Sequence, residues 1–263
     1  MSDETPALYD RYTLFFDFLG TSNAAATWPR ERIHQFVDLL IAIAQVQSAE
    51  DISGNSQADG SYRFAITPEV TVFSDNVVVS YSGVPQDTQP QKLLETVWAE
   101  IICKDAIRIL CWVAEMGLRI GLLIRGGLSY GQLHHESGVV FGEAMVDAHK
   151  LEKEIAANPR IVVSERVIAK LGYALPGNMK DILLPDTDST WHLNYFSAMM
   201  RQATLEPNGA DKGIRWKAAH LELINREICE LRCSTLPVAS RCAEKWEWFK
   251  QQFEAATHEI RLQ

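Results

Sequence analysis

Two aspartates in strand-like surroundings are the residues best placed to do chemistry. Asp17 interrupts the apolar run YTLFFDFLG, and Asp75 lies in the turn of VTVFSDNVVVS. Two such carboxylates, completed by substrate phosphates, suit Mg²⁺ or Mn²⁺, and a pair of these ions can activate an attacking oxygen and stabilise a leaving one. Each residue also has a structural interpretation. Asp17 can be a buried carboxylate satisfied by backbone amides or an arginine, and Asp75 can be an ordinary turn residue.

The composition is typical of a soluble globular protein, with 263 residues, 47% hydrophobic and 22% charged. The formal net charge of -9 argues against general nucleic-acid binding, which needs clustered Lys and Arg. No apolar run approaches the roughly 20 residues of a membrane helix, and the N-terminus MSDETPALYDR is too polar for a secretory signal. Five cysteines without a CxxC pair argue against a disulfide framework or a zinc ribbon. We therefore expect a cytoplasmic protein with no nucleic-acid or membrane partner.

The elements that must position the two aspartates alternate between strands and helices. Strand patterns cover residues 12–20 and both sides of Ser74–Asn76, which predicts a hairpin turn. Helical patterns cover 28–47 and 91–116, and the polar residues 48–61 between them read as an exposed loop. We expect an α+β fold in which an antiparallel-rich sheet carries its helices on one face.

The second half of the sequence continues this alternation. LRIGLLIRGGLSYGQL, residues 118–133, predicts a strand pair, and a helix follows Gly142 and ends before Asn158 and Pro159. A short strand and a short helix come next in RIVVSERVIAKLG, and two helices close the chain. We predict a catalytic domain over 1–200 and a C-terminal helical extension over 201–263 that packs on the core.

Four segments, in this order, resemble the catalytic domain of class III nucleotidyl cyclases. They are FFDFLGTS, FSDN, LRIGLLIRGGLSYG and FGEAMVDAHKLE with the following PRIVVS. The resemblance covers residues 12–165, and the order of four motifs is more specific than any one of them. It implies a ferredoxin-like core and a head-to-tail homodimer with active sites at its interface. There the 3′-oxygen of a nucleoside triphosphate attacks the α-phosphorus and pyrophosphate leaves.

The resemblance also implies roles for individual residues. Asp17, Asp75 and the backbone carbonyl of Phe18 match the ligands of two Mg²⁺ or Mn²⁺ ions. The turn that would hold the terminal phosphates through backbone amides consists of Leu19, Gly20, Thr21 and Ser22. Arg119, in LRIG, matches the triphosphate-binding arginine, and its alternative is a surface arginine on a strand.

Other positions depart from the pattern of the purine cyclases. Thr71 stands in place of their base-reading lysine, and Val139 in place of their base-reading aspartate. Their transition-state asparagine and arginine fall on Val146 and Lys150, so the asparagine is lost and the lysine lacks the bidentate fork of arginine. Arg125, in IRGG, is a second cation that can supply what Lys150 lacks, and its alternative is a structural ion pair.

With RGGLSYG and without purine readers, the sequence looks most like the pyrimidine cyclases of Pycsar anti-phage systems. Those enzymes make cyclic UMP or cyclic CMP, which activates a separate effector protein. We expect UTP as the substrate ahead of CTP. The alternatives are a cytidylate cyclase, a purine cyclase with unusual base contacts, and an inactive cyclase-like domain that binds a nucleotide. Retention of both aspartates favours an enzyme, because an inactive copy gains nothing from two repelling carboxylates.

Overall fold

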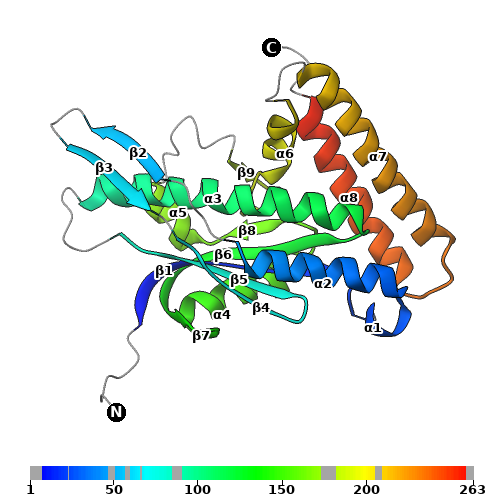
Figure 1. Ribbon diagram of the computed structural model, residues 1–263, viewed down its shortest axis with the longest axis horizontal. Coiled ribbons are helices and arrows are strands. Elements are labelled where there is room, and N and C mark those ends of the chain that lie inside the picture. The colour runs from blue at the N-terminus through cyan, green and yellow to red at the C-terminus, as the bar shows by residue number, and fades with distance from the viewer. Residues whose placement is uncertain are drawn as a thin grey trace.

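One large sheet forms the centre of the protein (Figure 1). The computed structural model describes residues 8–22, 24–46, 51–56, 60–65, 67–84, 91–172, 182–204 and 209–258. The strands of the large sheet are β1 (Tyr9–Leu19), β4 (Glu69–Phe73), β5 (Asn76–Ser82), β6 (Leu123–Glu136), β7 (Val139–Gly142), β8 (Ile161–Val163), β9 (Leu183–Pro185) and β10 (Trp191–Leu193). Their order is β4-β5-β1-β6-β8-β10-β9, with β7 paired to β6.

The helices flank and extend this sheet. They are α1 (Ala24–Thr27), α2 (Arg30–Ala44), α3 (Gln91–Arg119), α4 (Glu143–Lys150), the π-helical turn η1 (Leu151–Ile155), α5 (Glu165–Leu171), α6 (Tyr195–Thr204), α7 (Gly209–Cys233) and α8 (Ala239–His258). The mixture of a mostly antiparallel sheet with helices confirms the predicted α+β class.

The two faces of the central strand β1 differ: one packs in the large hydrophobic core, and the other carries Asp17 and packs in a small cluster. It pairs antiparallel with β5 on one side and with β6 on the other. Successive strand residues point to opposite faces, so Tyr12, Leu14 and Phe16 lie in the large core while Phe15 and Asp17 face the other way. The apolar alternation of the strand therefore directs Asp17 away from the large core.

Helices cover both faces of the sheet, so the expectation of helices on one face is wrong. The helices α2 and α3 lie on the side of the large core, and α4 lies on the opposite side (Figure 1). There Phe15 and Val78 pack against Ala148 of α4. Gly127 permits this approach, because a Cβ at that position would lie 2.5 Å from the Ala148 carbonyl oxygen. The amphipathic pattern of a short helix shows that one side of the helix is buried, but it does not indicate which face of the sheet that side packs against.

Two further local expectations are wrong. In the stretch 48–61, predicted as a loop, lie β2 (Asp51–Ser56) and the first two residues of β3 (Gly60–Ala65), and these two strands form a separate two-stranded sheet. The Asp, Ser, Gly and Asn residues of β2 have low strand propensity, so propensity does not signal this strand. The stretch 118–133 is not a strand pair either. Helix α3 runs on to Arg119, a turn with Gly121 at φ 69° follows, and a single strand begins at Leu123.

The C-terminal helices α7 and α8 pack against each other and against α6, and α7 also contacts α3. Aromatic side chains of α8, among them Trp246, Phe249 and Phe253, belong to the large core. The predicted boundary at residue 200 stays a prediction. Among the described helices, none combines the length and the apolar character needed to cross a lipid bilayer.

Candidate active site

Asp17 and Asp75 lie beside each other where β1 meets the β4–β5 hairpin. Asn76 is the register partner of Asp17, and Asp75 directly precedes it in the turn. The predicted hairpin is thus confirmed, with Ser74 in the left-handed region at φ 58°. The Phe18 amide donates a hydrogen bond to the Asp75 carbonyl oxygen at 3.3 Å, which ties the turn to β1. The strand register therefore brings together the backbones of two aspartates that are 58 positions apart in the sequence.

The turn after β1 adds further oxygen atoms beside Asp75. The Thr21 hydroxyl donates to the Asp75 carboxylate and lies 3.0 Å from the Phe18 carbonyl oxygen. Gly20 reverses the chain at φ 98°, a conformation that favours glycine. The turn leads into the short helix α1 through a 2.8 Å bond from the Ala24 amide to the Thr21 carbonyl oxygen. A carboxylate, a hydroxyl and a backbone carbonyl therefore meet at one point.

Arg125 joins Asp17 to a second buried carboxylate. Its Nε and Nη2 atoms donate to the two oxygens of Asp17 at 3.1 and 3.2 Å. Its Nη2 atom also lies 2.5 Å from Oε1 of Glu152, whose side chain is only 5% exposed. Burial, together with the charge of Asp17, raises the pKa of Glu152, and Arg125 opposes this rise. The guanidinium thus offsets the repulsion between two neighbouring carboxylates.

Helix α8 brings one more charge toward this cluster. Burial and the neighbouring Arg125 lower the pKa of Lys245, while the charges of Cys242, Asp17 and Glu152 act in the opposite direction. Sequence reasoning missed Glu152 and Lys245. Glu152 ends the segment FGEAMVDAHKLE, but the resemblance gives it no role, and Lys245 lies outside the matching segments. LEKE and AEKWE resemble ordinary charged helix faces, so only the packing of η1 and α8 distinguishes these residues.

The oxygen donors at this point fit a hard divalent cation. Mg²⁺ and Mn²⁺ prefer carboxylate and carbonyl oxygens and commonly take one or two carboxylates plus phosphate oxygens or water. Asp17, Asp75 and the Phe18 carbonyl are such donors. No group of three or more His, Cys, Asp or Glu side chains suited to a metal occurs among the described residues. A cation here would therefore need phosphate oxygens or water to complete its shell.

The structure pairs neither of the other predicted cations, Arg119 and Lys150, with Asp17. Arg119 is the last residue of α3 rather than a strand residue, and it is 59% exposed and paired with Glu115 at 2.8 Å. Lys150 is the exposed last residue of α4, and Val146, one turn before it, is also exposed. Of the predicted cations Arg119, Arg125 and Lys150, Arg125 is the one that the structure pairs with a predicted metal ligand.

Of the two candidate base-reading positions, Thr71 contacts His135 of β6, and Val139 lies on β7, which pairs with β6. The Thr71 hydroxyl is hydrogen-bonded to Nε2 of His135 at 2.9 Å, and Nδ1 of the same ring is bonded to the Ser80 hydroxyl at 2.8 Å. Burial lowers the pKa of His135. Its register partner is Val140, next to Val139, whose side chain is 58% exposed. Thr71 thus uses its hydroxyl within the protein, whereas Val139 presents a hydrocarbon surface to solvent.

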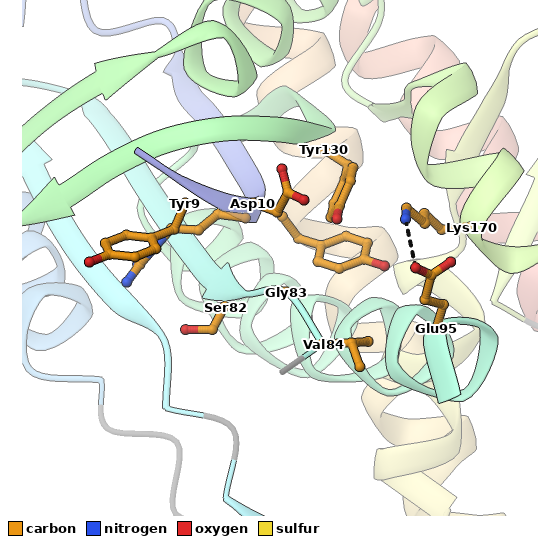
Figure 2. A pocket seen from close by; sticks show the side chains of 10 residues that line it. Tyr9, Asp10, Ser82, Gly83, Val84, Glu95, Tyr130 and Lys170 are labelled. Atoms are coloured by element: carbon orange, nitrogen blue, oxygen red, sulfur yellow. Dashed lines mark ion pairs between the residues drawn. The ribbon is translucent and has the colours of Figure 1, made fainter. Parts of the chain in front are cut away.

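A cavity of about 600 Å³ lies at the other end of β1. Figure 2 shows Lys170 and Glu95 facing each other there, with their charged atoms 3.2 Å apart. The Lys170 ammonium also lies 4.8 Å from the centre of the Tyr130 ring. The lining residue Tyr12 is separated from Asp17 by about 17 Å along an extended strand. This cavity is therefore distinct from the paired aspartates.

The chain matches no protein-family model and no curated protein. It is similar to two solved structures of a bacterial light-regulated adenylyl cyclase, at 17% and 16% sequence identity with TM-scores of 0.41 and 0.40. Both similarities cover 64% of this chain, and 46% and 47% of those chains, so this chain spans about half their length. It is also similar to the guanylyl cyclase Cya2, at 10% identity and a TM-score of 0.35, over 72% of this chain and 94% of that chain.

Proposed function

We propose that the protein is a nucleotidyl cyclase that converts a pyrimidine nucleoside triphosphate, UTP ahead of CTP, into the 3′,5′-cyclic monophosphate and pyrophosphate. The observation that carries this proposal is the pair of Asp17 and Asp75, held side by side with the Phe18 carbonyl. The four ordered motifs that resemble class III cyclases support it further. By the same resemblance to Pycsar cyclases, the product would be an anti-phage signal to a separate effector protein.

Each part of the proposed site has a distinct task. Asp17, Asp75 and the Phe18 carbonyl would hold Mg²⁺ or Mn²⁺, which would supply charge for the attacking 3′-oxygen and for the leaving pyrophosphate. The backbone amides of residues 19–22 would bind the terminal phosphates. Arg125, half-buried and already beside Asp17, would face the charge that develops on the phosphates.

The preference for a pyrimidine is supported by what the base would meet. A purine needs hydrogen-bonding partners along its six-membered edge, and each buried polar group left unpaired costs about 1–3 kcal/mol. The Thr71 hydroxyl is engaged by His135, and Val139 has no hydrogen-bonding group in its side chain. A smaller base, bound closer to the ribose, avoids this loss.

Incubation with equal concentrations of ATP, GTP, UTP and CTP plus Mn²⁺ tests the proposed function. We expect pyrophosphate release with cyclic UMP as the main product and cyclic CMP as the second, resolved by chromatography and mass spectrometry. Mainly cyclic AMP or cyclic GMP would overturn the pyrimidine assignment, and mainly cyclic CMP would overturn only the order. Binding of a triphosphate without pyrophosphate release would instead support an inactive, nucleotide-binding domain.

We also propose a homodimer with shared active sites. Exposed apolar side chains gather on β7 and α4, where Val139 is 58%, Phe141 70% and Val146 51% exposed. Neighbouring apolar residues of this kind are typical of a surface that a partner covers. By the resemblance to class III cyclases, a head-to-tail second copy would bring Lys150, at the end of α4, to the partner's aspartates, and its two-fold symmetry would form two such sites.

Mixing two inactive variants tests the shared site. We expect Asp75→Ala and Lys150→Ala chains to recover about one quarter of wild-type turnover, because half of the dimers are mixed and one of their two sites is intact. Asp75→Ala mixed with Arg125→Ala is the matched control and should recover nothing, since Arg125 pairs with Asp17 of its own chain. An active monomer in sedimentation analysis, or no recovery in the first mixture, would contradict the shared site.

A further inference from the structure

The turn η1 buries a glutamate, Glu152, although its sequence also contains the apolar residues Leu151 and Ile155. The turn η1 has the sequence LEKEI, and Glu152 is its buried residue, whereas Ile155 is 36% exposed. Burying a carboxylate costs free energy unless it is paired. The orientation of η1 therefore favours the contact between Glu152 and Arg125 over the burial of an isoleucine.

The fold is built to allow this contact. Gly127 lies two residues after Arg125 on β6, on the same face of the sheet. A Cβ at Gly127 would lie 2.6 Å from the Cβ of Leu151, so a side chain here would push η1 away from the strand. The backbone of η1 is widened into a π-helical turn, closed by a 2.8 Å bond from the Ala156 amide to the Leu151 carbonyl oxygen. Turns of this kind are rare in proteins, and those that occur are often found at functional sites.

Arg125 consequently has two carboxylates that compete for one guanidinium. Its Nη2 atom is 3.2 Å from Asp17 Oδ2 but 2.5 Å from Glu152 Oε1. Asp17 and Glu152 are only 19% and 5% exposed, so water screens these contacts poorly. If the charge of Glu152 were absent, Asp17 alone would hold the guanidinium.

We propose that Glu152 is a positioning residue that draws Arg125 partly away from Asp17, so that the Asp17 carboxylate stays available to a divalent cation. This inference rests on the cation site of the proposed function. In this arrangement Arg125 remains at the site as a phosphate-facing cation, because Glu152 anchors it when a metal ion takes its place beside Asp17.

The affinity for Mn²⁺ alone, measured from the electron paramagnetic resonance signal of free Mn²⁺, tests the proposal without turnover. We expect Glu152→Gln to weaken Mn²⁺ binding about fivefold, the size of one charge–charge interaction at a partly exposed site. Arg125→Gln removes the competing cation and should strengthen binding by about the same factor. In the Arg125→Gln background, Glu152→Gln should change the affinity less than about twofold, because the residue through which Glu152 acts is gone.

The matched controls are Arg232→Gln and Glu247→Gln, which break an exposed pair between α7 and α8 with a 2.6 Å contact. They should leave Mn²⁺ affinity unchanged. Thermal unfolding of each variant verifies the fold, and Glu152→Leu replaces Glu152→Gln if the latter does not fold.

Three outcomes would overturn the proposal. If Glu152→Gln weakens Mn²⁺ binding equally with and without Arg125, Glu152 acts on the cation directly. If it changes nothing in either background, Glu152 has only a structural role. If the wild-type protein binds no Mn²⁺ that depends on Asp75, the proposed cation site fails together with this inference.

Discussion

Asp75→Asn is expected to reduce turnover at least about 100-fold while leaving the fold intact. The amide keeps the size of the side chain and can still accept the hydrogen bond of Thr21, so the β4–β5 turn is preserved. The change removes the negative charge that a divalent cation needs. The measurement is the initial rate of pyrophosphate release from UTP with Mn²⁺ and with Mg²⁺.

Asp38→Asn, an exposed aspartate on α2, is the matched control and should retain wild-type turnover. Asp17→Asn should reduce turnover by at least about the same factor as Asp75→Asn. Wild-type rates in either site variant with either metal would refute the role of the aspartates as cation ligands.

The repulsion between Asp17 and Asp75 alone would suggest that Asp17→Ala stabilises the fold. Because Asp17 accepts two bonds from Arg125, we expect a loss of about 1 kcal/mol instead.

Gly126→Ala is expected to lower the free energy of unfolding by at least about 3 kcal/mol. A Cβ at this position would lie 2.1 Å from the Phe15 carbonyl oxygen and 2.7 Å from the Phe16 Cβ. Both contacts belong to the central strand β1, so relief requires β1 and β6 to separate rather than one flexible side chain to move. Chemical denaturation followed by circular dichroism measures the loss.

Gly138→Ala, at the β6–β7 turn, is the comparison variant. A Cβ there has open space around it, and only its φ of 80° disfavours alanine, which costs about 1 kcal/mol. If Gly126→Ala were as stable as Gly138→Ala, β1 and β6 would be able to separate at lower cost than the close contacts of Gly126 with Phe15 and Phe16 imply.

Local sequence patterns were sufficient for the elements that hold the two aspartates. The apolar run of residues 12–20 predicts a strand, and the structure has β1 there. The turn residues around Asp75 predict the hairpin that β4 and β5 form. These signals depend on neighbours one to four positions away, so no tertiary contact is needed to detect them.

The partners of Asp17 were decided by tertiary structure. Arg125 lies 108 positions further along the chain, and only the β1–β6 register places it opposite Asp17. Glu152 comes from η1, which can pack close to β6 only because Gly127 is a glycine and has no Cβ. A single sequence carries no signal for such contacts, because register and helix packing are set by the fit of whole surfaces. The sequence by itself thus determined the strand and turn that bear the aspartates, and the packing of distant elements decided which charges surround them.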